Sequence, residues 1–301
     1  MKAIIPVAGH GTRLEPHTLK LQKCLLPVAG KPVIEHILDI LISVGISEFT
    51  FIIGHFGEQV VQFTKKYTNV KFNFVKQEER LGLGHAIYQG LEKQETPIVI
   101  VLGDAILELD YSKLIENSNS VVGVAEVPDP ERFGIVELDG QFISKFHEKP
   151  KHPPSNLAIS GVYKINSQKQ LAESIEYLMA NDIRTKGEYQ LTDALQNMLD
   201  NGSVFVQHTI DNCLDCGIPE TLLQTNRILL GRINQNSTHS ESKIENSKLQ
   251  FATISKGCLV ENSTLENVIM LPNSKVLNQN ISDCIVGFNE ILTNEFDERL
   301  S

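Results

Sequence analysis

Two glycines and two basic residues near the N-terminus are spaced as in a site for phosphate groups. Gly9-His10-Gly11-Thr12-Arg13-Leu14 follows a short apolar run directly, and Lys23 belongs to the same connection. Glycines let a backbone turn tightly and bring its N–H groups close to a ligand. Arg13 and Lys23 add positive charge beside that backbone. The segment therefore indicates a loop that binds a polyphosphate.

This loop matches neither of the two most familiar phosphate-binding motifs. A dinucleotide-binding fingerprint needs a third glycine and an immediate helix, but Leu14 holds the third position and Pro16 disfavours an uninterrupted helix. A P-loop needs Gly-Lys-Ser/Thr after four spacers, and the sequence has no such string. A plain surface turn is the alternative interpretation, since glycine-rich turns are common.

Composition limits the partners of the chain. It has 301 residues and a formal net charge of −10, without a basic block, so we expect no nucleic-acid surface. Its apolar runs are too short for a signal core or a membrane span, so we expect no membrane partner. The five scattered cysteines predict reduced thiols in a cytoplasmic protein. The length suits one large domain and a smaller one.

Strand and helix patterns alternate through the first hundred residues. The sequence predicts strands over 3–7, 49–53, 70–75 and 98–102, and helices over 32–45, 58–67 and 84–91. Such alternation predicts right-handed crossovers and a mainly parallel sheet, whose ligands bind beyond the carboxyl ends of the strands. The glycine loop and Asp104 both follow predicted strands at that edge.

Helices become sparse after the fourth strand. Strands are predicted over 121–127, 135–138, 142–146, 157–165 and 204–209, and helices over 167–180, 191–200 and 219–230. The consecutive strands predict a mixed or antiparallel extension that covers one side of the site. The fold class expected for residues 1–232 is therefore α/β, with a Rossmann-like mixed, mainly parallel sheet flanked by helices.

The composition shifts to Asn, Ser and Thr from about residue 233. Aliphatic residues then recur roughly every five or six positions, at Ile244, Leu249, Ile254, Leu259, Leu265, Val276, Ile281 and Ile285. This spacing predicts a short left-handed β-helix-like segment of hexapeptide type over residues 240–301, and a loosely structured tail is the alternative. So few coils must pack on a neighbour or on another subunit, and we expect a homo-oligomer.

Polar residues at other predicted strand ends suit further parts of a nucleotide site. Gln77 can form two hydrogen bonds with the edge of a base, and Gly82 lets the backbone do the same. Asp104 can hold Mg²⁺ against phosphates, or it can simply cap the following segment. Glu148 and Lys149 can bind sugar hydroxyls and a phosphate, or they can form a solvated ion pair of little energetic weight.

In their order along the chain, these motifs resemble the signature of the sugar-1-phosphate nucleotidylyltransferases. The matching segments are 9–18, 23–28, 31–32, 82–86, 103–104, 133–134, 148–150, 155–158, 191–194 and 215–217. The resemblance covers residues 2 to 230. It extends to glucose-1-phosphate thymidylyltransferases with a C-terminal β-helix and to glucose-1-phosphate uridylyltransferases.

The resemblance implies transfer of a nucleotidyl group from an NTP to a hexose-1-phosphate, with Mg²⁺ as cofactor. It favours dTTP or UTP and glucose-1-phosphate, and gives an NDP-sugar and pyrophosphate by in-line attack on the α-phosphorus. It implies that Arg13 grips the β- and γ-phosphates and that Lys23 neutralises the α-phosphate. The other implied positions are Ala8, Gly9, Gly11, Thr12, Gln77 and Gly82 for the nucleotide, Gly134, Glu148, Lys149 and Ile159 for the sugar phosphate, and Asp104 and Asp215 for Mg²⁺.

Two other functions stay open beside this one. A non-catalytic nucleotide-sugar-binding regulatory or assembly subunit of the same fold would be expected to have lost Arg13, Lys23 or an implied metal ligand, but all are present. A bifunctional enzyme with an acyltransferase β-helix is disfavoured, because the tail has few coils and no candidate catalytic His. The tail carries none of the implied site residues, so deleting residues 240–301 is predicted to leave them intact but to alter solubility or assembly.

Overall fold

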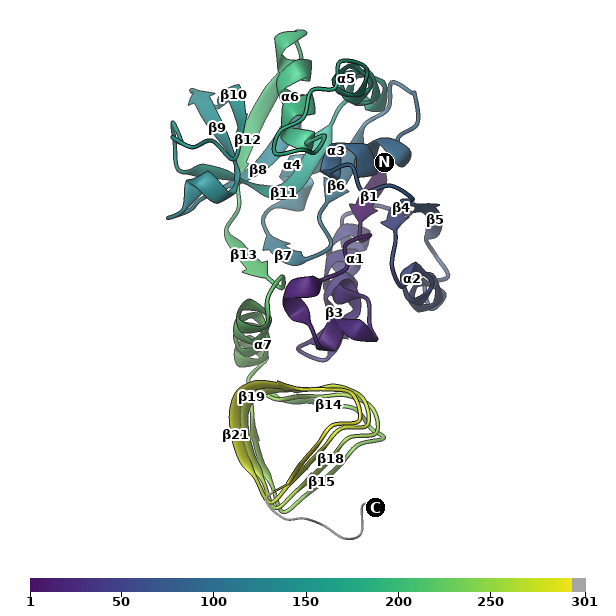
Figure 1. Cartoon of the computed structure of the whole chain (residues 1–301), viewed down its shortest axis with the longest axis vertical. Coiled ribbons are helices and arrows are strands. Elements are labelled where there is room, and N and C mark those ends of the chain that lie inside the picture. The colour runs from purple at the N-terminus through teal and green to yellow at the C-terminus, as the bar shows by residue number, and fades with distance from the viewer. Residues whose placement is uncertain (294–301) are drawn as a thin grey trace. The chain divides into compact units, whose positions relative to one another are not determined.

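The computed structural model describes residues 1–293 and divides the chain into two compact units (Figure 1). The sheet unit consists of Met1–Gly9 and Ile37–Cys213. The coil unit combines His10–His36 with the chain from Leu214 on. Each unit thus gathers segments that are distant in the sequence, and each is described by itself below.

Four parallel strands form one half of the nine-stranded sheet of the sheet unit. They lie in the order β5 (Lys71–Lys76), β4 (Glu48–Ile53), β1 (Lys2–Pro6) and β6 (Ile98–Val101). β6 is buried over its whole length, as expected for an apolar strand covered on both faces. Along the sequence, β4 and β5 are added on one side of β1, whereas β6 is added on its other side, so the direction of strand addition reverses between β1 and β6. In open α/β sheets ligands bind at this reversal, beyond the carboxyl ends of the strands.

The other half of the sheet is mixed. It continues from β6 through β11 (Leu157–Ile165), β8 (Ser120–Glu126), β12 (Phe205–Thr209), β10 (Phe142–Glu148) and β9 (Gly134–Asp139). β11 runs antiparallel to β6 and β8, whereas β12 runs parallel to β8. The register of β11 shifts between Ile159 and Tyr163, where Gly161 has a φ of +87°. The predicted Rossmann-like mixed sheet is confirmed.

Five of the six helices before residue 201 lie close to where the sequence predicts them, and one short helix is additional. They are α1 (Val33–Ser43), α2 (Gly57–Thr64), α3 (Leu83–Gln89), α4 (Tyr111–Glu116), α5 (Gln168–Ala180) and α6 (Leu191–Asp200). α3, α5 and α6 contribute to one apolar core with the sheet. The prediction that Pro32 begins a helix is wrong by one residue, because Pro32 belongs to β3 and α1 begins at Val33.

Two short elements after β6 were not predicted from the periodicity of the sequence. β7 (Ala105–Glu108) has four residues and α4 has six, too few for a periodic pattern. An Asp is a common residue at the start of a helix, so Asp110 was a sequence signal for α4. In the structure its carboxylate caps the helix by accepting a hydrogen bond from the Lys113 N–H at 3.0 Å.

The N-terminal part of the coil unit is a series of short 3₁₀ turns and a hairpin. The turns are η1 (Thr12–Leu14), η2 (His17–Leu19) and η3 (Lys23–Leu25), and the hairpin pairs β2 (Pro27–Val28) with β3 (Lys31–Pro32). The predicted absence of a continuous helix after the glycine loop is therefore confirmed. α7 (Pro219–Ile233) then leads into the C-terminal strands of the unit.

The C-terminal strands form a triangular β-helix-like coil, seen end-on in Figure 1. They are β14 (Ser237–Thr238), β15 (Lys243–Glu245), β16 (Lys248–Gln250), β17 (Thr253–Ile254), β18 (Leu259–Glu261), β19 (Thr264–Met270), β20 (Lys275–Leu277), β21 (Asn280–Val286) and β22 (Ile291–Thr293). Stacked strands pair in parallel, and the hydrogen-bond partners on successive coils are 16 positions apart. Each coil is thus two residues shorter than three hexapeptides.

The aliphatic residues of this coil form its core. Ile254, Leu265 and Val276 are buried as predicted, and Ile244, Leu249 and Ile281 pack against them. Val260 and Val286 belong to the core instead of the predicted neighbours Leu259 and Ile285. Successive side chains on a strand point to opposite faces, so an error of one position selects the wrong residue.

Asparagines occupy corners of the coil where the backbone is left-handed. Asn246, Asn262 and Asn278 have φ values of 48°, 47° and 55°. Asn tolerates this conformation better than most side chains, which lose roughly 1–2 kcal/mol in it. Among residues 1–293, no helix combines the length and the apolar character needed to cross a bilayer.

We expect Asn262→Ala to lower the thermal unfolding midpoint of the coil by an amount equivalent to about 1 kcal/mol, because alanine lacks the tolerance of Asn for a left-handed backbone. Asn262→Gly should cost less. The matched control is Asn280→Ala in the extended strand β21. Equal losses from Asn262→Ala and Asn280→Ala would contradict the account of the corners.

Candidate functional site

The carboxyl ends of β1 and β6 form the floor of the site in the sheet unit. A Cβ on Gly103 would lie 2.6 Å from Val7 Cγ1, so the chain after β6 passes directly against the chain after β1. A Cβ on Gly54 would lie 2.7 Å from the Ala8 carbonyl oxygen. Glycine thus lets one segment pack against the Val7 side chain and another against the Ala8 backbone. Asp104 is half-buried at the same edge of the sheet.

Gln77 and Gly82, the two residues predicted to contact the base, lie on the connection between β5 and α3. The Gln77 N–H donates to Ile53 O at 2.8 Å, which extends the pairing of β5 with β4 by one step. Gly82 has a φ of +117°, and a Cβ there would lie 2.6 Å from Tyr189 O. The Tyr189 N–H donates to Leu81 O at 2.7 Å. Close packing against Tyr189 therefore accounts for this glycine structurally, and its predicted role toward a base stays a prediction.

Three of the residues predicted for the sugar phosphate come together at one point. A Cβ on Gly134 would lie 3.1 Å from Ile159 Cδ1 and 3.2 Å from Glu148 Oε2. Gly134 belongs to β9, Glu148 to β10 and Ile159 to β11. The Glu148 side chain is 7% exposed, and its carboxylate forms an ion pair with Lys149 Nζ at 3.1 Å. The pair presents a carboxylate and an ammonium group at the end of β10.

Thr192 and Asp193, at the start of α6, join this cluster although the sequence analysis gave them no role. Thr192 Oγ1 lies 2.9 Å from the position of a Cβ on Gly134. Asp193 Oδ2 is buried and has no hydrogen-bond partner within the described part of the chain. Burial raises the pKa of Asp193, a hydrogen bond from Thr185 lowers it, and the charge of Glu148 raises it again.

The signal for these two residues was present in the sequence, because the segment 191–194 belongs to the motif series that carries the family resemblance. Glu148 and Asp193 are two carboxylates, and the buried Oδ2 of Asp193 has no hydrogen-bond partner among residues 1–293. Carboxylates are acceptors only, so the cluster suits a ligand with several hydroxyl donors. A sugar has this chemistry.

The residues predicted for the phosphates meet in the coil unit. Gly11 has a φ of +70°, and a Cβ there would lie 2.9 Å from Lys23 Cβ. Thr18 Oγ1 donates to Gly11 O at 2.8 Å, which fixes the backbone at this glycine. The lysine side chain therefore starts directly against the glycine loop, as a joint phosphate site requires. Thr12 and Arg13 follow in η1, and Arg13 is exposed.

Asp215 has a structural task besides its predicted role toward Mg²⁺. Its Oδ1 accepts from the Gly217 N–H at 3.1 Å, and its Oδ2 accepts from Thr221 Oγ1 at 2.7 Å. A Cβ on Gly217 would lie 3.2 Å from Arg13 Nη2. Arg13 and Asp215 thus flank the same glycine at the start of α7. Each carboxylate oxygen accepts two hydrogen bonds or metal contacts in general, so both roles are compatible.

The predicted site residues therefore fall into two sets. The sheet unit holds Ala8, Gly9, Gln77, Gly82, Asp104, Gly134, Glu148, Lys149 and Ile159, and the coil unit holds Gly11, Thr12, Arg13, Lys23 and Asp215. No cluster of three or more His, Cys, Asp or Glu that could hold a metal occurs among residues 1–293. The chain can thus offer Mg²⁺ one or two carboxylates, and Mg²⁺ sites commonly take their remaining ligands from phosphates and water.

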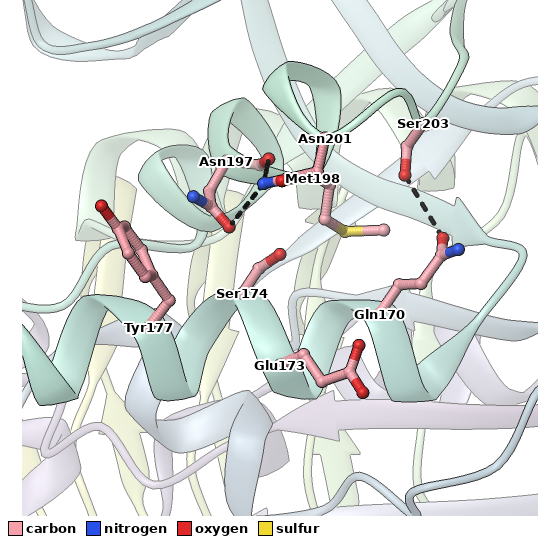
Figure 2. Close-up of a pocket in the computed structure, with 8 residues that line it drawn as sticks. All are labelled: Gln170, Glu173, Ser174, Tyr177, Asn197, Met198, Asn201 and Ser203. Carbon is pink, nitrogen blue, oxygen red and sulfur yellow. Dashed lines mark hydrogen bonds between the residues drawn. The ribbon is translucent and has the colours of Figure 1, made fainter.

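A separate groove between α5 and α6 contains none of these residues (Figure 2). It has a volume of about 490 Å³ and is lined by Gln170, Glu173, Ser174, Tyr177, Asn197, Met198, Asn201 and Ser203. Its amide and hydroxyl groups bond to one another, for example Ser203 Oγ to Gln170 Oε1 at 3.3 Å. The lining has one carboxylate and no cation, so it does not suit a polyphosphate.

Comparison with known proteins adds three relatives and one family. Residues 2–231 match the family model described as "Nucleotidyl transferase". The "Bifunctional protein GlmU" of Methanococcus maripaludis is 32% identical over 278 residues, which cover 91% of this chain and 62% of that protein. A "Bifunctional sugar-1-phosphate nucleotidylyltransferase/acetyltransferase" of Sulfurisphaera tokodaii is 32% identical over 251 residues. The matched region covers 81% of this chain and 60% of that protein. This chain thus spans about three fifths of the length of these relatives.

A solved structure is similar as well. It is a Bacillus anthracis protein, described as a candidate glucose-1-phosphate thymidylyltransferase, in complex with a sucrose. The two structures superpose with a TM-score of 0.65 at 28% identity, over 76% of this chain and 94% of the other. The similarity therefore reaches well beyond the glycine loop.

Asp193→Asn should stabilise the protein increasingly as the pH rises. The folded state raises the pKa of Asp193, so it binds this proton more tightly than the unfolded chain does. The associated stability is present below the unfolded pKa of about 3.9 and is lost as the pH rises through the higher folded value. The Asp193→Asn variant has no titrating group at this position, so it does not lose this stability as the pH rises. The measurement is the unfolding midpoint of both proteins between about pH 4 and pH 8.

Asp139→Asn is the matched control, because Asp139 is exposed at the end of β9. Its midpoint should differ little from that of the parent at any pH. A pH-independent difference between the parent and Asp193→Asn would show that burial of this carboxylate is not costly.

Proposed function

We propose that this chain, which belongs to the nucleotidyl transferase family, transfers a nucleotidyl group from an NTP to a sugar-1-phosphate. The observation that carries the proposal is the family match over residues 2–231, which includes every predicted site residue. The resemblance to sugar-1-phosphate nucleotidylyltransferases found in the sequence is confirmed at the level of the family. The phosphate loop and the carboxylate cluster supply matching chemistry for the two substrates.

For the particular substrates we propose dTTP or UTP with glucose-1-phosphate. Gln77 and the Gly82 backbone support a pyrimidine, since both can offer hydrogen bonds to a base edge. The printed description of the Bacillus anthracis relative supports glucose-1-phosphate. The name of the Sulfurisphaera tokodaii relative joins nucleotidylyl transfer to acetyl transfer, and this favours an N-acetylated sugar phosphate as the second candidate.

The proposed reaction needs no covalent enzyme intermediate. An oxygen of the sugar phosphate attacks the α-phosphorus of the NTP in line, a new O–P bond forms, and the bond to the β-phosphate oxygen breaks. Pyrophosphate leaves with the electron pair of that bond. Catalysis then consists of positioning the reactants and offsetting their negative charge.

Each named side chain has a task in that scheme. Arg13 binds the β- and γ-phosphates and remains with the leaving pyrophosphate. Lys23 lies against the glycine loop and neutralises charge on the α-phosphate. Glu148 and Asp193 accept hydrogen bonds from sugar hydroxyls, and Lys149 pairs with the sugar phosphate.

Asp104 and Asp215 are the proposed ligands of Mg²⁺. Both offer carboxylate oxygens, the donors that Mg²⁺ prefers, and the small number of protein ligands agrees with a metal shared with substrate phosphates. When bound, Mg²⁺ supplies positive charge that offsets the repulsion between two anionic reactants. The hydrogen bonds from Gly217 and Thr221 hold the Asp215 carboxylate in place for this purpose.

A cytoplasmic location and a homo-oligomer complete the proposal. Within the described residues no two cysteines form a disulfide, which supports a reducing compartment. The alternative of a non-catalytic regulatory or assembly subunit predicts nucleotide-sugar binding without turnover.

We expect pyrophosphate release from dTTP or UTP with glucose-1-phosphate, and at least tenfold less from ATP. A site built to pair with a pyrimidine edge leaves polar groups unsatisfied when a purine binds. The measurement is pyrophosphate release from a matrix of four NTPs against glucose-1-phosphate, N-acetylglucosamine-1-phosphate and mannose-1-phosphate, with Mg²⁺ present.

The outcomes of this matrix separate the proposals. Equal rates with all NTPs would refute the role of Gln77, and a clear preference for the N-acetylated sugar would select the second candidate. Binding of an NDP-sugar without turnover of any pair would support the regulatory subunit instead.

Asp104→Asn and Asp215→Asn should each lower kcat by roughly a hundredfold or more at ordinary Mg²⁺. Each change keeps the shape and removes one negative charge, and metal-based charge stabilisation is worth several kcal/mol. The measurement is kcat against Mg²⁺ concentration, with metal-free nucleotide affinity alongside. That affinity should fall little or rise, because a carboxylate near the phosphates has gone.

Asp211→Asn is the matched control, since Asp211 is exposed four positions before Asp215. It should keep the parental kcat. A variant of Asp104 or Asp215 that turns over like the parent at every Mg²⁺ concentration would remove that residue from the metal site.

A further inference from the structure

Asn226 is the most completely buried polar side chain on α7, with an exposure of 0%. Its Oδ1 accepts from the Ala29 N–H at 3.0 Å and from Thr253 Oγ1 at 2.6 Å. Its Nδ2 donates to Phe251 O at 2.9 Å. One side chain thus joins three segments of the coil unit: the β2–β3 hairpin, α7 and the first coil of the β-helix.

The two backbone groups that Asn226 holds belong to residues in left-handed conformations. Ala29 has a φ of 47° and Phe251 a φ of 52°, values that non-glycine residues adopt at a cost in energy. Such conformations persist only where the surroundings determine them. A Cβ on the neighbouring Gly30 would lie 2.0 Å from Ser237 Oγ, so the hairpin also touches the β-helix directly.

The hairpin follows immediately after the segment that carries Lys23. The Leu26 N–H donates to Lys23 O at 3.2 Å, and the Val33 N–H donates to Leu26 O at 3.1 Å. Leu26 therefore links the turn of the lysine to the base of the hairpin. Two backbone hydrogen bonds thus connect the turn that carries Lys23 with the strands below the hairpin tip at Ala29.

α7 makes a second contact of this kind one residue earlier. Thr225, 2% exposed, donates through Oγ1 to Asp215 O at 2.9 Å. Consecutive buried residues of α7 thus hold the backbone of Asp215 and the hairpin after Lys23. A helix that carries both contacts fixes the two segments relative to each other.

We infer that Asn226 is a positioning residue, through which the first coil of the β-helix sets the place of Lys23 in the proposed reaction. The inference rests on the proposed function of Lys23. It assigns the β-helix a part in catalysis, in addition to packing. The prediction that deletion of residues 240–301 leaves the site intact must then be revised, because the deletion removes the contacts with Phe251 and Thr253.

The primary test compares Asn226→Ala with Asn236→Ala in the full-length protein. Asn236 is the matched control: its Nδ2 donates to Leu249 O at 2.9 Å and its Oδ1 accepts from the Ala252 N–H at 2.8 Å, but neither of these bonds reaches the hairpin. We expect Asn226→Ala to lower kcat tenfold or more and to change the KM for the sugar-1-phosphate less than threefold. Asn236→Ala should keep kcat within twofold at a similar loss of thermal stability.

A second measurement does not depend on activity. Amide hydrogen exchange at Ala29 should become at least tenfold faster in Asn226→Ala and stay unchanged in Asn236→Ala, since only the former removes the acceptor of that N–H. If the parent releases no pyrophosphate from any substrate pair, the proposed function fails, while the exchange rates still test the link to the hairpin.

Thr253 supplies variants in case Asn226→Ala does not fold. Thr253→Val removes the hydroxyl that bonds to Asn226 and should lower kcat about threefold, whereas Thr253→Ser keeps the hydroxyl and should restore it. Three results would overturn the inference: unchanged exchange at Ala29, faster exchange with an unchanged kcat in an active protein, or an equal loss of kcat in Asn236→Ala.

Discussion

The parallel pairing of β1 with β6 is the constraint on which the sheet unit depends. β6 has four consecutive buried aliphatic residues, and Ala3, Ile4 and Ile5 of β1 are equally inaccessible. Strands of this kind are stable only at the centre of a sheet with both faces covered. The direction of strand addition reverses between them, and ligands of open α/β sheets bind beyond the carboxyl ends of the strands at such a point. Ala8 and Asp104 follow β1 and β6 at this edge.

The residues around this opening are kept close by the absence of side chains. Gly54 and Gly103 pack against the Val7–Ala8 backbone, Gly82 packs against Tyr189, and Gly134 packs between Glu148 and Ile159. A methyl group at any of these positions would meet a neighbour at 3.2 Å or less. Close packing of this type brings backbone donors and acidic side chains from several strands to one place without large voids. The glycines of the site thus have a packing role as well as a conformational one.

Much of this fold follows from short-range rules. The apolar strands, the mixed sheet, the helices α5, α6 and α7 and the coil after residue 233 all carry periodic patterns that extend over several repeats. The elements that the sequence did not predict, such as β7 and α4, are too short to show a period. The core of the β-helix was misread at Leu259 and Ile285 because a spacing of five or six residues does not define which of two neighbours points inward.

The site was predictable in part for a similar reason. Arg13, Lys23, Glu148 and Asp104 stand in motifs with distinctive residue types, so the sequence alone singles them out. Thr192 and Asp193 also stand in one of these motifs, but only their approach to Gly134 and Glu148 indicates which part of the candidate site they belong to. Asn226 is more hidden still, because an Asn within a helix resembles any exposed polar residue until its three partners are known.

Electrostatics explain why positioning must carry so much of the proposed catalysis. The chain has 37 acidic and 27 basic residues, so an approaching polyphosphate meets a net repulsion. Long-range attraction cannot concentrate such a ligand, and binding must come from a few cations in contact with it. Contact interactions weaken steeply when a side chain moves, because they depend on hydrogen-bond geometry as well as charge. An acidic protein in which one lysine is proposed to act at the reacting phosphate therefore needs that lysine fixed by its surroundings. The buried bonds of Asn226 meet this need from the side of the β-helix.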